Sequence, residues 1–124
     1  MTIKIFDWPV VQMHFTGHVT SAEFHEWLMN TTLLMARAVP FSVVTSSAVD
    51  LSLPEDYRKQ EAIWYKANKD LLSQSCKGIA RVVHDEQQFA QFNSKAMHHA
   101  WPCPFFVSLS LHEAISWAEQ QLKL

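Results

Sequence analysis

The chain has 124 residues, a formal net charge of -2, and 48% hydrophobic against 18% charged residues. The hydrophobic share excludes a disordered chain, and the near-neutral charge excludes the strongly basic surface that binds nucleic acid or an anionic membrane. Only two glycines are present, which excludes every glycine-rich phosphate loop or dinucleotide fingerprint, because those loops need several residues without a side chain.

The first third of the chain predicts a hairpin, a helix and a further strand. Residues 3–6 are a short β-prone run, and residues 10–15 alternate between two sides in the manner of a half-buried strand. Thr20 and Glu23 have the spacing of a capping box, which predicts the start of a helix. The β-rich run 41–45 follows that helix and predicts the central strand.

A long helix is expected after the central strand. The stretch 52–55 reads S-L-P-E, a second capping box with proline inside the first turn, so we expect Ser52 to cap this helix. The apolar stripe ends near Cys76. Gly78 is then expected in the left-handed conformation that closes many helices.

The rest of the chain predicts two strands and two helices: a strand at 79–84, a helix capped by Asp85, a strand at 105–109 and a helix capped by Ser110. The element order is therefore β-β-α-β-α-β-α-β-α. Alternating strands and helices predict an α/β fold with a mainly parallel sheet and right-handed crossovers. The length is that of one domain, which we expect to span residues 1–124.

Polar residues interrupt the predicted strands. Strands that are buried on both faces should be almost continuously apolar. Five residues break that pattern: Gln12, His14, Ser42, Arg81 and Ser108. We therefore expect helices largely on one face of the sheet, with the other face partly open or covered by a partner. Gln12, His14 and Arg81 are the resulting interface candidates.

Two of the five tryptophans are also interface candidates. Trp8 and Trp101 lie beside prolines near the ends of predicted elements, where an exposed aromatic ring would line an interface or an apolar ligand pocket. Trp27 and Trp64 instead fall on apolar helical stripes, which predicts that they belong to the core.

Four stretches carry a resemblance that spans nearly the whole chain: G-x-V-T-x-x-E-F at 17–24, P-F-S-V-V-T at 40–45, G-I-A-R-V-V at 78–83 and E-A-I-S-W-A at 113–118. Together with the element order they resemble the STAS/SpoIIAA-like superfamily, and its bacterial stand-alone STAS/SEC14-like members in particular. The resemblance implies a SpoIIAA-like β-α superhelix and a non-enzymatic regulatory or protein-interaction module. It implies a protein partner or a homodimer. The lipid-binding relatives imply the alternative of a carrier for an apolar or anionic small molecule.

The resemblance also points to a phosphoswitch. Antagonists in the superfamily are phosphorylated on a serine in an Asp-Ser-Ser-Gly type motif at the start of the second helix. This chain departs from that motif, because the stretch 45–48 lacks both the aspartate and the glycine. Ser46, Ser47 and Ser52 are the remaining candidates for a phosphate or anion, and an ordinary helix cap is the favoured interpretation of Ser52.

The ends of the last two strands supply a further set of candidates. His84, Asp85 and the stretch 108–110 lie where parallel strands gather their loops beside the serines of the central strand. Ser, His and Asp together are the side chains of a hydrolase triad. No G-x-S-x-G elbow is present, and Asp85 and Ser110 are explained as helix caps. We therefore expect no enzyme and no catalytic residues, with a hydrolase as the weakest alternative and His84 and Ser110 as ligand-site candidates.

No metal or cofactor is expected. Cys76 and Cys103 are too few and too far apart in the sequence for a zinc site or a disulfide scaffold. His98 and His99 are adjacent and would point about 100° apart on a helix, so they cannot share a metal. The N-terminus lacks a signal-peptide pattern, and no apolar run reaches ~18 residues. These features predict a cytoplasmic protein without a membrane span.

Overall fold

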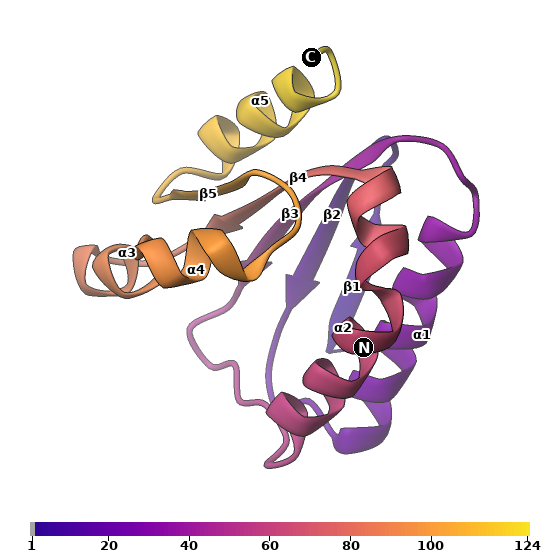
Figure 1. Ribbon diagram of the computed structural model, residues 1–124. Helices are drawn as coiled ribbons and strands as arrows, with labels where there is room; N and C mark the ends of the chain where they lie inside the picture. The colour runs from indigo at the N-terminus through magenta and orange to yellow at the C-terminus, as the bar shows by residue number, and fades with distance from the viewer. Residues whose placement is uncertain (1) are drawn as a thin grey trace.

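The computed structural model describes residues 2–124. Its elements are β1 (Ile3–Phe6), β2 (Val10–Phe15), α1 (Ser21–Met35), β3 (Phe41–Ser47), α2 (Tyr57–Ser75), β4 (Cys76–Val82), α3 (Glu86–Phe92), α4 (Lys95–Ala100), β5 (Phe105–Ser108) and α5 (Leu111–Gln121). The strands form one sheet in the order β1-β2-β3-β4-β5 (Figure 1). β1 runs antiparallel to β2, and all other neighbours are parallel. The predicted α/β class and hairpin are confirmed.

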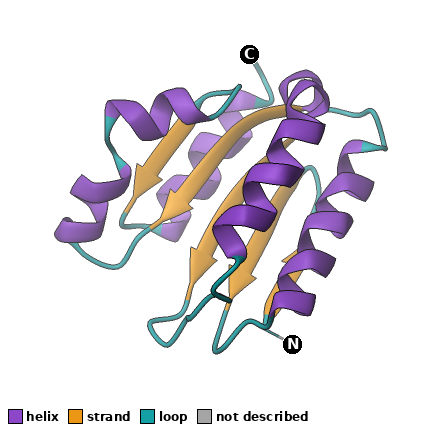
Figure 2. Cartoon of the chain, turned by 60° about the horizontal axis from the view of Figure 1, so that its bottom comes forward, coloured by secondary structure: helices purple, strands orange, loops and turns teal. Residues whose placement is uncertain are grey.

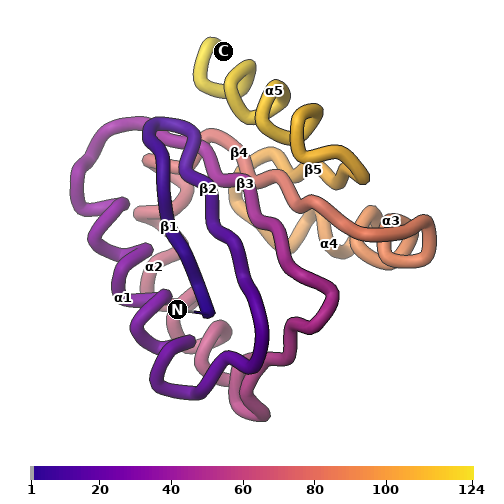
Figure 3. The backbone as a smooth tube through the Cα atoms, turned by 180° about the vertical axis from the view of Figure 1, so that it is seen from behind, coloured from indigo at the N-terminus to yellow at the C-terminus, as the bar shows by residue number. Residues whose placement is uncertain are grey.

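The helices cover the two faces of the sheet unequally. α1 and α2 pack against one face, which we call the helical face (Figure 2). α3 and α4 lie near β5, and they add side chains such as Phe92 and Met97 to the same core. α5 packs on the other face over β3 to β5 and the start of β2, and β1 and the rest of β2 run past it without a helix over them (Figure 3). Four of the five helices therefore contribute to the core on the helical face.

The alternation of β2 decides which side chains enter the main core. Val11 and Met13 are buried on the helical face, beside Phe24 of α1. Trp64 of α2 is buried there as well, and Trp27 is half-buried against the same cluster. The core roles predicted for these two tryptophans are confirmed.

Small side chains let α5 approach the sheet closely. Ala114 and Ala118 are fully buried and belong to one cluster with Val44 and Ala80. The Ser42 hydroxyl, also fully buried, donates a hydrogen bond of 3.0 Å to the carbonyl oxygen of Ala118. The polarity of Ser42 therefore reflects a contact with α5, and not an open part of the sheet.

The predicted caps of α1 and α5 are confirmed. The Thr20 hydroxyl accepts from the backbone N–H of Glu23, whose carboxylate accepts from the Thr20 N–H. The Ser110 hydroxyl accepts from the N–H of Glu113. The Glu113 carboxylate turns to the buried Ser108 hydroxyl instead, at 2.9 Å. The buried hydroxyl of Ser108, like that of Ser42, therefore has a hydrogen-bond partner inside the fold.

The predicted cap of α2 is wrong. The helix begins at Tyr57, and the residue before it, Asp56, makes no side-chain cap hydrogen bond. Ser52 forms an isolated parallel bridge with His18, and its N–H and carbonyl bond to the two residues that flank His18. These backbone bonds hold Ser52 in an extended connection, so the helix cannot start there.

The role predicted for Gly78 is also wrong. α2 ends at Ser75 and β4 begins directly at Cys76, so Gly78 lies inside a strand. A Cβ at this position would lie 2.8 Å from Cη2 of Trp117 and 3.0 Å from Cγ of Gln121. Glycine is required here because α5 lies directly on the strand.

The helix predicted after β4 is two short helices. Asp85 caps α3 as predicted, accepting from the Gln88 N–H at 2.8 Å. Ser94 then caps α4, accepting from the Met97 N–H at 3.2 Å. A serine whose side chain bonds the backbone favours a new helix start over a continuous helix.

Candidate functional site

Part of the sheet on the α5 side has no helix over it. We call this part the open face, and it consists of the outward side chains of β1 to β3 beyond α5: Lys4, Phe6, Gln12, His14 and Ser46. The strand register aligns Lys4, His14 and Ser46 in one row. Phe6 and Gln12 start the next row, which continues to Val44 under α5.

A histidine and a serine are hydrogen-bonded within this face. Nδ1 of His14 lies 2.8 Å from Oγ of Ser46, and both side chains are half-buried. The contact follows from the parallel pairing of β2 with β3, which places the two residues side by side. Ser46 was predicted as a ligand candidate and His14 as an interface candidate, and the structure brings them together.

A second histidine–serine pair lies at the same end of β2 and β3. Nδ1 of His18 is 2.8 Å from Oγ of Ser52, and both residues are exposed. The bridge between their backbones positions them. Asp50 strengthens this connection, since its carboxylate accepts from the Gly17 N–H at 3.3 Å. His18 was not among the predicted site residues, although its place in the turn after β2 was the available signal.

The remaining ligand candidates do not take part in these pairs. Ser47 ends β3 opposite Phe15 and is half-buried. His84 follows β4, and its backbone N–H donates to Gln88 of α3. Ser110 caps α5. The structure thus pairs the serines of the central region with His14 and His18, and not with the predicted His84.

The two histidine–serine pairs have one feature of a hydrolase centre. A separation of 2.8 Å is the distance between a nucleophile and its base. A working centre also needs a group that orients the imidazole and a cleft for the substrate. Within residues 2–124, no carboxylate bonds either imidazole, and neither pair lines the two hollows described next.

A hollow of about 450 Å³ lies beside the open face, between the β1–β2 connection and the end of α5. Its lining is mostly apolar and combines two segments that are far apart in the sequence: Asp7, Trp8, Pro9, Val10, Gln12, Ile115, Glu119, Leu122 and Lys123. Trp8 is 36% exposed, and its ring stacks on Phe41 while the Arg37 guanidinium lies 4.4 Å from its centroid. The Gln12 amide donates to the Asp7 carboxylate at 2.7 Å. The predicted candidates Trp8 and Gln12 therefore share one hollow.

Arg81 and Trp101 do not belong to the open face. Strand alternation puts Arg81 on the helical face, where its guanidinium lies 4.2 Å from the centroid of Phe92. Burial lowers the pKa of Arg81 and raises the pKa of the nearby Glu61 carboxyl. Trp101 is half-buried on the same core and meets Tyr65 edge-on at 5.9 Å. The prediction that placed Arg81 at an open surface is corrected, because its neighbours Ala80 and Val82 face α5 and strand alternation turns Arg81 to the opposite side.

Cys76 and Cys103 come together despite their separation in the sequence. Pairing of Ile79 with Phe105 draws the start of β4 alongside the chain that enters β5. A hydrogen bond between the two thiols lowers the pKa of Cys76 and, together with burial, raises the pKa of Cys103. Both cysteines are free thiols. Only the register between two strands brings them together.

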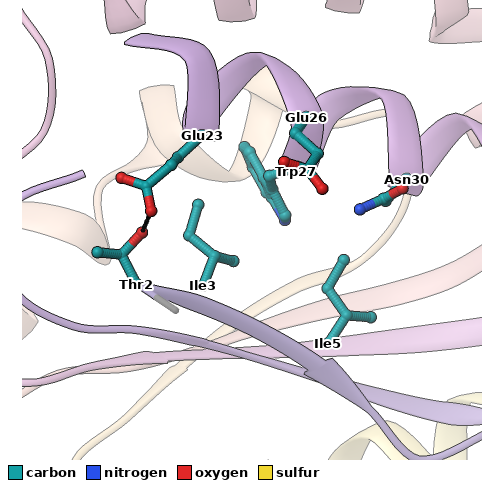
Figure 4. Close-up of a pocket in the computed structure, with 7 residues that line it drawn as sticks. All are labelled: Thr2, Ile3, Ile5, Glu23, Glu26, Trp27 and Asn30. Atoms are coloured by element: carbon teal, nitrogen blue, oxygen red, sulfur yellow. Dashed lines mark hydrogen bonds between the residues drawn. The ribbon is translucent and has the colours of Figure 1, made fainter. Parts of the chain in front are cut away.

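A second hollow, which we call the edge groove, lies between β1 and α1 (Figure 4). Its volume is about 250 Å³, and its lining comes from β1, the residue before it and α1: Thr2, Ile3, Ile5, Glu23, Glu26, Trp27 and Asn30. The Thr2 hydroxyl donates to the Glu23 carboxylate at 2.9 Å. Hydrogen bonds from Thr20 and then Thr2 lower the pKa of Glu23, so this carboxylate is ionised at neutral pH. Sequence reasoning missed the groove, since none of its residues is unusual by itself.

Two further features of residues 2–124 bear on function. They contain no group of three or more histidine, cysteine, aspartate or glutamate side chains placed to hold a metal ion. None of their helices combines the length and the apolar character that crossing a membrane requires.

Comparison with known proteins gives a structural likeness. No family model matches the chain, and no curated protein matches it. A solved structure that is similar is an uncharacterized protein of the DUF3478 family from Shewanella loihica PV-4, described as having a SpoIIAA-like fold. It is 14% identical, with a TM-score of 0.66 over 94% of this chain and 91% of that chain. At this identity the likeness concerns the fold, and it agrees with the resemblance in the sequence. The chain has a SpoIIAA-like fold.

Proposed function

We propose that the protein is a non-enzymatic protein-interaction module that binds a second protein through its open face. The observation that supports this most strongly is the uneven cover of the sheet. Parallel strands are usually covered on both faces, yet β2 and β3 have helices on the helical face and, beyond α5, none over the open face. Phe6 is 43% exposed there, which leaves apolar surface available for burial.

The chemistry of the open face suits recognition of a protein. Protein interfaces combine aromatic anchors with a polar rim of hydrogen-bonding groups. Phe6 and the adjoining Trp8 supply exposed aromatic surface, while Lys4 and Gln12 supply charge and hydrogen-bond donors around it. Association of two copies through this face is the simplest form of the interaction, because one surface then serves both partners.

Site-specific photocrosslinking in the living cell tests the proposal. Phe6→p-benzoyl-phenylalanine places a crosslinker on the open face with little change of shape. The matched control carries the same residue at Leu33, which is 66% exposed on α1. We expect one defined protein adduct from position 6, either a second copy or another protein, and none from position 33.

A second substitution on the same face makes this test specific. His14→Glu introduces a negative charge on the open face, opposite Lys4 and one row away from Phe6, so it should abolish the adduct at position 6 if the face is recognised. An adduct that survives His14→Glu, or equal adducts from positions 6 and 33, would show non-specific contact. Either result, like the absence of any protein adduct at position 6, contradicts the proposal.

The hollow beside the open face favours a second candidate, a carrier of an apolar or anionic small molecule. Its volume of about 450 Å³ lies in the range of small-molecule sites. Trp8, Ile115 and Leu122 give it apolar walls, and Lys123 gives it a cation. Native mass spectrometry of gently purified protein separates the two candidates. A bare dimer supports the interaction module, and a monomer with a defined extra mass that Trp8→Ala removes supports the carrier.

A further inference from the structure

β1 is an edge strand with free backbone groups on its outer side. In an antiparallel pair, opposite residues alternate between pairs that exchange two hydrogen bonds and pairs that exchange none. The Thr16 N–H donates to the Thr2 carbonyl at 2.7 Å, so Thr2 and Thr16 are a bonded pair. The register makes Lys4 and Phe6 the next bonded residues of β1. The N–H and carbonyl groups of Ile3 and Ile5 therefore point away from β2.

The edge groove lies on the helical side of this same edge. Ile3 and Ile5 contribute its β1 wall, while Trp27 and the side chains around it descend from α1 (Figure 4). A strand that pairs with the outer side of β1 would direct every second side chain toward α1. The free backbone groups and the groove therefore offer one continuous binding surface for an extended segment.

Charge specifies which side chains would enter the groove. Glu23 and Glu26 are its only charged lining residues, and both are acidic. Glu23 is held in place by Thr2 and by its own capping box. Ile5 and Trp27 provide apolar surface below these carboxylates. A lysine or arginine side chain matches this arrangement, because its stem packs on apolar surface while its charged end meets a carboxylate.

A second copy of the chain does not supply such a side chain. If β1 of one copy paired with β1 of another, the side chains directed to the helical side would be Ile3 and Ile5. Both belong to the core of their own copy, and neither carries a positive charge. Lys4 points to the open face instead. The two acidic grooves would also approach each other.

We propose that β1 accepts an extended segment of a different protein as a sixth strand, with lysine or arginine side chains entering the edge groove. This inference rests on the proposed function only in that the chain binds proteins, and it concerns a different surface from the open face. Main-chain hydrogen bonds to Ile3 and Ile5 give the affinity, and Glu23 and Glu26 give the preference for basic residues.

A labelled peptide with alternating threonine and lysine tests this site. We would measure its binding by fluorescence anisotropy, and follow hydrogen exchange of the backbone amides by NMR at saturating peptide. The amides of Ile3 and Ile5 should become protected by about tenfold or more, because they gain hydrogen bonds. Those of Lys4 and Phe6 already bond to β2, so their exchange should change little.

Two controls separate strand addition from general attraction. Glu26→Gln should lower the affinity for the lysine peptide by about two- to fivefold, which is the effect of losing one exposed ion pair. Glu55→Gln removes another exposed charge, outside the groove, and should have no effect. Peptides with glutamate for lysine, or with proline for threonine, should not bind.

Binding without protection of Ile3 and Ile5 would overturn the proposal, as would equal binding of the acidic peptide or no binding at peptide concentrations up to about 1 mM. The crosslink at Phe6 is read separately, so failure of the edge site and failure of the open face are distinguishable.

Discussion

Substituting alanine for Gly78 measures how tightly α5 lies on the sheet. The new Cβ would be 2.8 Å from Cη2 of Trp117 and 3.0 Å from Cγ of Gln121. The Trp117 ring has little room to turn, because it stacks on Phe106 with centroids 5.1 Å apart and planes 11° apart. Overpacking by one methyl group costs about 1–3 kcal/mol. Alanine also restricts the unfolded chain more than glycine does, which stabilises the folded protein by about 0.4–1 kcal/mol. We therefore expect Gly78→Ala to lower the free energy of unfolding by about 1–2 kcal/mol.

A double-mutant cycle identifies the cause of this loss. Trp117→Phe removes the ring atoms that crowd the position and leaves only the contact with the flexible Gln121 side chain, so Gly78→Ala should then no longer destabilise the protein and should raise the free energy of unfolding by up to about 1 kcal/mol. Urea unfolding followed by far-UV circular dichroism gives all four free energies. Gly17→Ala is the control, because Gly17 has φ +65° and no atom within 4 Å of an added Cβ. Its cost of about 1 kcal/mol should be the same in both backgrounds. An equal cost of Gly78→Ala in both backgrounds would refute the packing argument.

Three further predictions test other contacts. Ser110→Ala removes the cap of α5 and should lower the free energy of unfolding by about 1 kcal/mol, whereas Ser52→Ala, at a position that caps no helix, should change it by less than about 0.5 kcal/mol in the same urea assay. Burial raises the pKa of Glu61 above 4.5, so the folded protein keeps this proton to a higher pH than the unfolded chain. The free energy of unfolding should therefore decrease as pH rises from the pKa of Glu61 in the unfolded chain to its higher pKa in the folded protein. If Glu61→Gln keeps the wild-type dependence of the free energy of unfolding on pH, the reasoning is contradicted. A fluorophosphonate probe should leave Ser46 unlabelled, and labelling that His14→Ala abolishes would instead identify a nucleophile.

Local sequence signals predicted the elements well where local chemistry decides them. The capping patterns of Thr20 and Ser110 involve residues three positions apart, so the sequence contains both partners. The alternation predicted for residues 10–15 is likewise confirmed, because Val11 and Met13 are buried. The capping pattern gave a wrong prediction at Ser52. The backbone of Ser52 pairs with that of His18, 34 positions earlier, and this pairing outweighs a cap worth about 1 kcal/mol.

Contacts between distant segments could not be predicted in this way. Gly78 has the sequence context of a helix end, and only the approach of Trp117 reveals why glycine is needed. The candidate Ser46 was found from the sequence, but its partner His14 becomes apparent only from the register of β2 with β3. The edge groove depends on the distance between a strand and a helix, which no spacing of residues encodes.

The order of the strands has a consequence for synthesis on the ribosome. Each strand pairs with the strand that precedes it in the chain, so the sheet can grow one strand at a time as the polypeptide emerges. α5 follows all five strands, yet it contacts β2 to β5. Val44, Ala80 and Phe106 therefore stay uncovered until α5 has left the exit tunnel. A nascent chain that has reached β5 presents an apolar sheet surface of the kind that chaperones shield.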